Sequence, residues 1–227
     1  MSISRFAFFD VDETLIELKS MFSFRAYYFR WLWGESRGGV EEDRVAQEIR
    51  DQVEKGADRS SINRLFYRIF MGHRQQDFRA AAHAWHQHVR SRPDFFVAPV
   101  LSELRKHQTN GTDVVFVSGS CTEILAPLAD ELQVKYMLAN RMCVVDGCFT
   151  GEILSPQTIG EGKRVAINAF LADGDFDPAE CFGYGDHLSD LPLLEAVGRP
   201  SVVARSEELL AIARQRGWPI LNPTNIQ

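Results

Sequence analysis

Cysteine is scarce in this sequence, and the cysteines present are widely spaced. The 227 residues contain four of them, and no two form a C-x-x-C pair: Cys121, Cys143, Cys148 and Cys181. This spacing suits no common zinc pattern. It favours reduced thiols in a cytosolic protein over structural disulfides.

Long apolar runs are absent as well. No uninterrupted apolar segment reaches the roughly 18–20 residues that a membrane-spanning helix needs, so no integral membrane association is expected. The N-terminus also lacks the apolar core and small-residue cleavage site of a signal peptide. We therefore expect a cytoplasmic protein, either a monomer or a homodimer.

An excess of positive charge is also lacking. The chain has 25 lysines and arginines against 31 aspartates and glutamates, which gives a formal net charge of −6. Nonspecific nucleic-acid binding needs a basic face, so no nucleic-acid partner is expected. A local site for an anionic small molecule stays open, because a site depends on local rather than net charge.

What the sequence does contain is apolar material for one sizeable core, with short apolar strands alternating with helices. Hydrophobic residues make up 45% of the chain. Strands are predicted at about 6–9, 114–117, 134–138, 181–185 and 201–204. Helices are predicted at about 98–109, 121–132, 162–172, 191–196 and 206–216. Such alternation indicates an α/β fold with a mostly parallel sheet and helices on both faces. Asp146-Gly147 predicts the turn of an additional β-hairpin.

Residues 18–94 interrupt this alternation. They are rich in arginine, glutamine, glutamate and aromatic residues, with helical spacing and few β-branched residues. We expect an all-helical insertion at 18–94 and a core domain made of residues 1–17 and 95–227.

Polar clusters follow three of the predicted strands. They are Asp10-x-Asp12, Ser118-Gly119-Ser120 and Gly185-Asp186-x-x-x-Asp190. Each alone is explained equally well as a turn, a helix cap or a loop. The carboxyl ends of adjacent parallel strands meet at one edge of a sheet, where ligands bind. Three clusters together, with a lysine on a helix between the second and third, favour a shared site.

The chemistry that these residues suggest is phosphoryl transfer through an aspartyl phosphate. Asp10 would attack phosphorus and split a difficult hydrolysis into two easier steps. Asp12 would protonate the leaving group and then activate water. The Ser118 hydroxyl, the Gly119 amide and the Lys163 ammonium would bind the phosphoryl oxygens.

A hard cation such as Mg²⁺ would relieve the repulsion between phosphate and carboxylates. Asp10, Asp186 and the backbone carbonyl of Asp12 are its candidate ligands. Asp190 is either a further ligand or a residue that orients one.

The same residues resemble the motifs of the haloacid dehalogenase superfamily, in its phosphoserine-phosphatase-like branch, subfamily IB. The matching segments, in order, are Asp10-Val11-Asp12-Glu13-Thr14, Val117-Ser118-Gly119-Ser120, Gly162-Lys163 and Gly185-Asp186-His187-Leu188-Ser189-Asp190. The resemblance implies a Rossmann-like core, a helical cap inserted after the first motif, Mg²⁺ and phosphomonoester hydrolysis. An aspartate at position 12 is similar to the phosphatases of this superfamily rather than to its dehalogenases.

Two positions depart from the phosphoserine phosphatase pattern. Lys19 stands where those enzymes carry a glutamate that pairs with the substrate ammonium, and Ser189 stands where they carry an asparagine. A lysine prefers an anion. We therefore expect Lys19 and Ser189 to contact a small phosphorylated metabolite other than phosphoserine, one with a second anionic group or with hydroxyls.

Three other functions stay open on the sequence. A phosphotransferase or mutase would pass the aspartyl phosphate to an alcohol, and a binding protein could sit on an inactive core. A lipid-phosphate phosphatase would explain the aromatic residues 21–33, which we otherwise interpret as the insertion's own core or as a pocket wall.

Several further side chains are candidates for the site. His187 is a candidate substrate contact because it follows Asp186. A metal site at His83 and His86 is less favoured than a solvated helix face. The arginines that could reach a substrate anion, although a solvent-facing role is favoured, are Arg44, Arg64 and Arg68.

Overall fold

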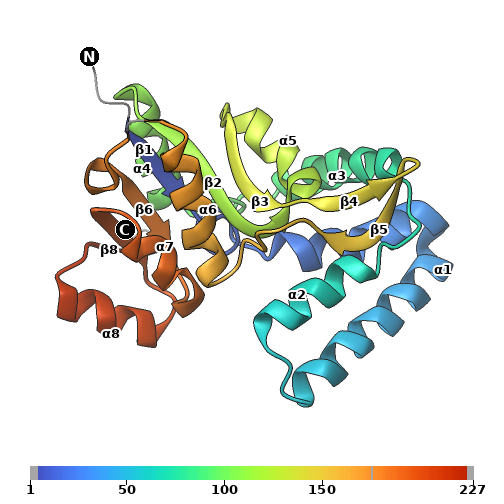
Figure 1. Cartoon of the computed structure of the whole chain (residues 1–227). Coiled ribbons are helices and arrows are strands. Elements are labelled where there is room, and N and C mark those ends of the chain that lie inside the picture. The colour runs from blue at the N-terminus through green and yellow to red at the C-terminus, as the bar shows by residue number, and fades with distance from the viewer. Residues whose placement is uncertain (1–4, 175, 224–227) are drawn as a thin grey trace.

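The computed structural model describes residues 5–174 and 176–223, so the ends of the expected core at residues 1 and 227 lie outside it. A six-stranded sheet forms one end of the molecule (Figure 1). Its order is β3-β2-β1-β6-β7-β8, and each neighbouring pair is parallel. The strands are β1 (Phe6–Phe9), β2 (Asp113–Cys121), β3 (Tyr136–Asn140), β6 (Phe182–Gly185), β7 (Arg199–Val203) and β8 (Ile220–Leu221).

The central strand β1 is buried on both faces, as its continuous apolar sequence requires. Phe6 and Phe8 enter the core on one face of the sheet, and Ala7 and Phe9 enter the core on the other. Because β1 lies between β2 and β6, the residue that follows Phe9 emerges in the middle of the sheet edge.

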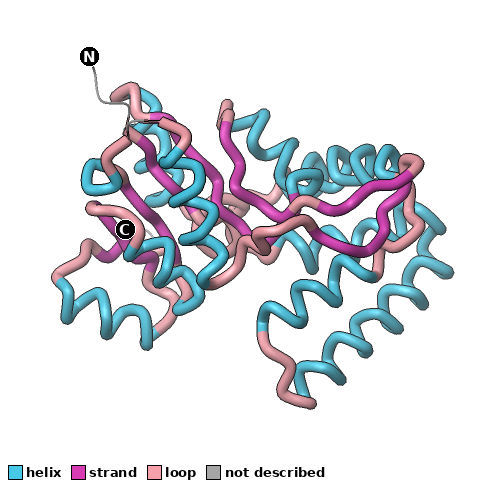
Figure 2. Tube along the Cα trace, in the orientation of Figure 1, coloured by secondary structure: helices cyan, strands magenta, loops and turns pink. Residues whose placement is uncertain are grey.

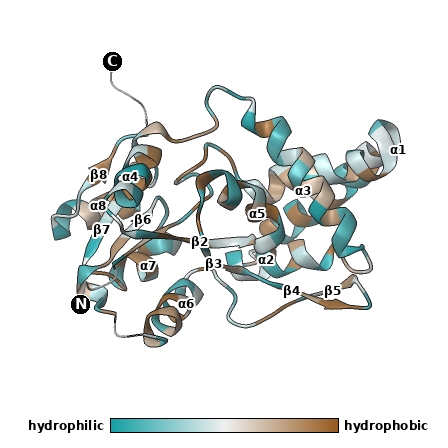
Figure 3. Cartoon of the chain, turned by 90° about the horizontal axis from the view of Figure 1, so that it is seen from above, coloured by the Kyte–Doolittle hydropathy of each residue, from teal (hydrophilic) through white to brown (hydrophobic). Residues whose placement is uncertain are grey.

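Helices cover both faces of the sheet. The core with Phe8 includes apolar residues of α6 (Glu161–Ala172), α7 (Leu191–Glu195) and α8 (Glu207–Arg216). The core with Phe9 includes residues of α4 (Ala98–Thr109) and α5 (Thr122–Leu132). Figure 3 shows α4 and α6 on opposite sides of the strands. The predicted α/β fold with a mostly parallel sheet is confirmed, and no helix within the described ranges is long and apolar enough to cross a membrane.

Three helices form a second layer beside the sheet (Figures 1 and 2). They are α1 (Ser20–Glu54), α2 (Arg59–Arg68) and α3 (Gln75–Arg90). The first of them bends at Gly34, whose backbone φ of 77° is not helical. These helices fill most of residues 18–94, the helical insertion of the sequence analysis.

A β-hairpin leaves the sheet and packs on the helical insertion. It consists of β4 (Met142–Val145) and β5 (Cys148–Ile153). The amide of Gly72 donates to the carbonyl of Phe149 at 2.8 Å, and the amide of Phe149 donates to the carbonyl of His73 at 2.9 Å. The sequence predicted the hairpin turn, but this pairing with the loop before α3 has no local sequence signal.

The aromatic residues 21–33 form mainly the core of the helical insertion. Phe24, Tyr28 and Phe29 are fully buried, whereas Trp31 is 41% exposed. The guanidinium of Arg25 donates two hydrogen bonds to the buried carboxylate of Glu42, at 2.8 and 2.7 Å. The segment also forms part of a pocket wall, because Met21 and Phe22 line the cavity described below.

Candidate active site

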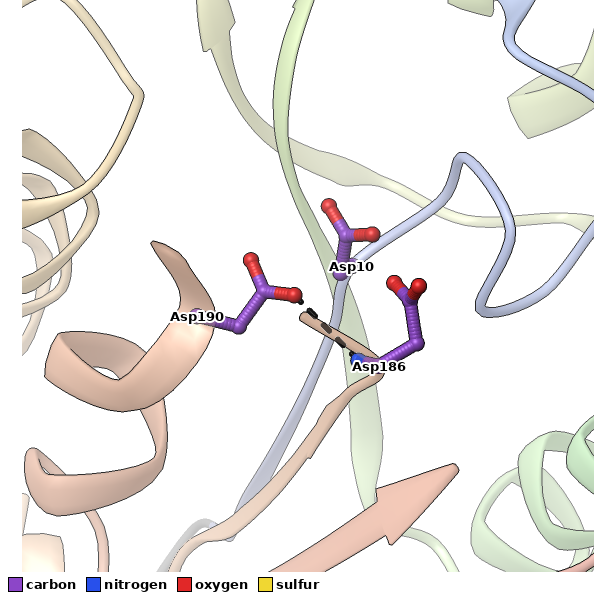
Figure 4. Close-up of side chains that lie close together, drawn as sticks. All are labelled: Asp10, Asp186 and Asp190. Carbon is purple, nitrogen blue, oxygen red and sulfur yellow. Dashed lines mark hydrogen bonds between the residues drawn. The ribbon is translucent and has the colours of Figure 1, made fainter. Parts of the chain in front are cut away.

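The polar clusters that follow β1 and β6 lie side by side at one edge of the sheet. The amide of Asp10 continues the β1–β6 pairing by donating to the carbonyl of Tyr184 at 2.9 Å. Carboxylate oxygens of Asp10, Asp186 and Asp190 all lie within 4.8 Å of one another, and all three residues are buried (Figure 4). Within the described ranges this is the only cluster of acidic, histidine or cysteine side chains with metal-binding geometry.

Asp190 returns to the site because the chain turns tightly after β6. A Cβ on Gly185 would lie 2.6 Å from the Cβ of Asp190, so glycine permits this close approach. One oxygen of Asp190 accepts from the amides of Asp186 at 3.2 Å and His187 at 3.1 Å. The other oxygen accepts from Lys163. Asp190 is therefore held from both sides.

Lys163 bridges two of the carboxylates from the first turn of α6. Its ammonium donates to Asp10 at 2.5 Å and to Asp190 at 2.7 Å, and its side chain is only 4% exposed. A Cβ on the preceding Gly162 would lie 1.8 Å from the carbonyl oxygen of Gln157. Glycine is thus required for the tight turn that aims α6 at the site.

The electrostatics of the cluster favour a bound cation. Burial raises the pKa of Asp10 well above its ordinary value despite the opposing charge of Lys163. Burial and the neighbouring Asp190 raise the pKa of Asp186 to about 6. Burial opposes the charge of Lys163, but Asp10 and Asp190 outweigh it and raise the pKa of the lysine. The site thus holds three buried carboxylates against one ammonium, which contacts two of them, and hard oxygen ligands of this kind fit Mg²⁺.

Asp12 lies close to this cluster but its carboxylate is not part of it. One of its oxygens, Oδ1, is buried without a hydrogen-bond partner among the described residues. Burial raises the pKa of Asp12 to about 6, and this increase is limited by Ser20 at the start of α1. Its role as a backbone-carbonyl ligand stays a prediction.

The end of β2 supplies the remaining polar groups. Ser118 is 1% exposed, and its hydroxyl oxygen accepts from the amide of Ser120 at 3.1 Å. The Ser20 hydroxyl at the start of α1 donates to the hydroxyl of Ser120 at 2.9 Å. These serines lie within β2, which continues to Cys121, so the strand end predicted at residue 117 is wrong. The last residues of β2 are therefore tied to the helical insertion.

A cavity of about 330 Å³ lies between this sheet edge and the helical insertion. Its polar floor includes the predicted groups Asp10, Asp12, Ser118, Gly119, Lys163, Asp186 and Asp190. Apolar side chains from the insertion and from the segment before α6 form another wall: Met21, Phe22, Val53, Ala57, Ile62 and Ile159.

The predicted substrate contacts Lys19 and Ser189 also line the cavity. The Lys19 ammonium lies 3.2 Å from the carboxylate of Glu13, and both side chains are about half exposed. The Ser189 hydroxyl lies 3.2 Å from Nδ1 of His187. Glu13 thus balances part of the positive charge that the sequence analysis assigned to Lys19.

Arg59 is a cavity residue that the sequence analysis missed. It starts α2, and its guanidinium lies 3.1 and 3.2 Å from the two ring nitrogens of His187. Burial and the charge of Arg59 lower the pKa of His187. No local signal distinguishes Arg59 from the other arginines of the insertion, since its place depends on how α2 packs against the core.

The remaining candidate arginines and histidines of the insertion lie away from the cavity. Arg44 pairs with Glu41 and Glu48, Arg64 bonds to Gln157, and Arg68 lies 4.0 Å from Glu152. His86 bonds to Glu131 at 2.8 Å, and no metal-binding cluster of described residues includes His83 or His86.

Comparisons with known proteins agree with the fold. A "probable phosphatase" of Mycobacterium tuberculosis is 34% identical over 220 residues, covering 95% of this chain and 74% of the relative. A Bordetella pertussis protein of unknown function has a crystal structure with a TM-score of 0.86 and 26% identity, covering 98% of this chain and all of that one. A substrate-bound phosphoserine phosphatase has a TM-score of 0.66 at 15% identity, covering 99% and 95%, which shows likeness of fold alone.

The family assignment rests on a match to most of the chain. The family model of haloacid dehalogenase-like hydrolases matches residues 7–195. With the phosphatase-named relative, this match confirms the predicted family and the enzyme class, a hydrolase of the phosphatase type. The chain belongs to the haloacid dehalogenase-like hydrolase family.

Proposed function

We propose that the chain is a Mg²⁺-dependent phosphatase that hydrolyses a small phosphorylated metabolite through an aspartyl phosphate on Asp10. The observation that carries this proposal is the buried cluster of Asp10, Lys163 and Asp186 at the floor of a cavity, with Asp12 beside it. The phosphatase name of the Mycobacterium tuberculosis relative supports the same reaction class.

The first step is attack by a carboxylate oxygen of Asp10 on phosphorus. The new oxygen–phosphorus bond forms as the ester bond to the leaving group breaks, and Asp12 gives the leaving oxygen a proton. The unpartnered oxygen of Asp12 is free to carry that proton. Lys163 orients Asp10 through its hydrogen bond, and together with Ser118 it donates to the phosphoryl oxygens.

The second step regenerates the enzyme. Asp12, now ionised, takes a proton from water as the water oxygen attacks phosphorus. The bond between phosphorus and Asp10 breaks, and inorganic phosphate leaves. Asp10, inside the cluster, is thus the nucleophile, and Asp12, outside it, is the acid–base group.

Mg²⁺ would be held by Asp10, Asp186 and the backbone carbonyl of Asp12. When bound, it would neutralise the repulsion between the phosphate and the carboxylates. Asp190 would act as the residue that orients Lys163 and the loop after β6, because both of its oxygens already accept hydrogen bonds. The unshared oxygens of Asp10 and Asp186 remain for the metal.

The cavity favours a substrate with a second anionic group and a compact body. Arg59 has no carboxylate within 4.0 Å among the described residues, so it is available to an anion. The cavity volume of about 330 Å³ suits a small metabolite. A cytoplasmic location, a monomer or homodimer, and movement of residues 18–94 as a cap belong to the same proposal.

The test is phosphate release from a broad panel of phosphorylated metabolites, with Mg²⁺ or with EDTA, for the wild type and Asp10→Asn. We expect turnover that needs Mg²⁺ and is lost in the variant. Added alcohol acceptors detect a phosphotransferase, and dispersed lipid phosphates detect a lipid phosphatase. A wild type that hydrolyses nothing in the panel contradicts the proposal, and phosphoserine as the best substrate contradicts the interpretation of Lys19.

A further inference from the structure

The backbone carbonyl of Gly119 accepts an unusual number of hydrogen bonds. The donors are the side-chain amide of Asn63 at 2.8 Å, the hydroxyl of Tyr67 at 2.7 Å and the side-chain amide of Asn140 at 2.8 Å. Two of these donors lie on α2 in the helical insertion, and the third ends β3 in the core. A carbonyl oxygen has two lone pairs, so these three donors exceed its usual number of hydrogen bonds. Together they fix the direction in which the Gly119 carbonyl points.

A second layer of hydrogen bonds fixes the two asparagines themselves. The oxygen of Asn63 accepts from Asn140 and from Gln157, each at 2.9 Å. The oxygen of Asn140 accepts from the amide of Thr158 at 2.8 Å. Because each asparagine both donates and accepts here, the amide orientations are determined by the network. Asn63, Tyr67 and Asn140 are at most 5% exposed.

The peptide group between Gly119 and Ser120 connects this network to the catalytic floor. A peptide is planar, and in its trans form the carbonyl and the amide point in opposite directions. The three donors hold the carbonyl on one side, and the amide of Ser120 on the other side donates to the hydroxyl oxygen of Ser118 at 3.1 Å. This contact occupies a lone pair of Ser118 and leaves its proton for another acceptor.

We propose that Tyr67, Asn63 and Asn140 are positioning residues that orient the Ser118 hydroxyl toward the phosphoryl group through the Gly119–Ser120 peptide. This inference rests on the proposed function, in which Ser118 donates to the transferring phosphoryl group. Since two of the three donors come from α2, the helical insertion completes the catalytic floor as well as the substrate pocket.

Tyr67 is the cleanest residue with which to test this role. It does not line the cavity, whereas Asn63 does, so its loss cannot remove a direct substrate contact. Tyr67→Phe removes one hydroxyl and keeps the buried ring. Tyr28→Phe is a matched control, because Tyr28 is equally buried in the same helical layer and its hydroxyl bonds to His73 at 2.9 Å, away from the cavity.

The experiment is a double-mutant cycle on kcat and KM with the best substrate of the wild type. The variants are Tyr67→Phe, Ser118→Ala, their combination, and Tyr28→Phe. We expect Tyr67→Phe to lower kcat about tenfold with little change in KM, and to cost nothing further in the Ser118→Ala background. Tyr28→Phe should keep the wild-type kcat, and melting curves should show that both tyrosine variants fold.

Three outcomes overturn the inference. An unchanged kcat in Tyr67→Phe denies the role of Tyr67. An equal loss of kcat with and without Ser118 shows that Tyr67 does not act through that hydroxyl. A wild type without turnover overturns the proposed function, and the positioning role falls with it. Asn140→Ala repeats the cycle from the core side, where the same dependence on Ser118 is expected.

Discussion

The two sides of the cavity are built in different ways. On the sheet side, Asp10, Lys163 and Asp190 are nearly inaccessible to solvent and are joined by short hydrogen bonds. On the insertion side, apolar residues such as Phe22 and Ile62 stand beside the exposed Arg59. The sheet side is buried, hydrogen-bonded and highly charged, which suits one fixed reaction. The insertion side offers an apolar wall and the exposed cations Lys19 and Arg59, which suits the choice of a substrate.

This contrast assigns different consequences to changes on the two sides. A change on the sheet side should stop turnover of every substrate, whereas a change on the insertion side should alter the ranking of substrates. The hydrogen bonds to the Gly119 carbonyl are the exception that connects the two sides, because two of the three donors come from α2 and the acceptor lies in β2 beside Ser118.

The largest effect on turnover is expected on the sheet side. Asp10→Asn removes the nucleophile and should lower kcat by about 10⁴-fold or more, as losses of catalytic nucleophiles do. Phosphate release measures this loss, and circular dichroism checks that the variant folds. Asp51→Asn, on the solvent side of α1, is a control that should keep wild-type turnover. Residual activity close to wild type in Asp10→Asn would refute the assigned nucleophile.

Metal removal should also lower turnover, because the proposed metal ligands lie on the sheet side of the cavity. Dialysis against EDTA should lower turnover by about two orders of magnitude or more, and added Mg²⁺ should restore it. Mg²⁺ should also raise the melting temperature of the metal-free protein, because ligands stabilise the state that binds them. Asp186→Asn should lose this rise in melting temperature. Full turnover in EDTA would contradict a metal site at this cluster.

A smaller and more selective effect is expected on the insertion side. Arg59→Ala should raise KM about tenfold for substrates with a second anionic group, because it removes a charged hydrogen-bond donor. The same variant should hydrolyse p-nitrophenyl phosphate with nearly unchanged KM. Arg68→Ala, on the same helix but outside the cavity, is the control. An equal rise in KM for both kinds of substrate would deny selective recognition by Arg59.

The smallest effect on turnover is expected within the insertion itself. Glu42→Ala leaves the guanidinium of Arg25 buried without its partner, which should reduce the free energy of unfolding by about 3–5 kcal/mol. Turnover at low temperature should stay near that of the wild type. Glu41→Ala breaks the exposed pair with Arg44 and should cost about 1 kcal/mol or less. Urea unfolding of both variants measures the difference, and equal losses would contradict it.

The sequence predicted the sheet side of the cavity better than the insertion side. Asp10 and Asp186 directly follow strands and Ser118 lies near the end of β2, so a rule about strand ends was sufficient to bring them together. The predicted helix 98–109 has the observed bounds, and most other elements agree within two residues. The two-residue strand β8 was missed, because a segment so short has no periodic pattern.

The insertion side depends on packing between distant segments, which local patterns do not encode. Arg59 and Tyr67 reach their partners only because α2 docks on the core. The docking of the hairpin on the loop before α3 has the same origin. The composition of residues 18–94 indicated helices, but it did not show which side chains would face the cavity.

The most direct test of the account is to detect the phosphorylated enzyme. Wild-type protein should be mixed with its best substrate, quenched in acid within the first turnover, and digested for mass spectrometry. The account predicts one phosphoryl group on the peptide that contains Asp10, and none on that peptide in Asp10→Asn. Turnover without any phosphorylated Asp10, or with the phosphoryl group on another residue, would contradict it.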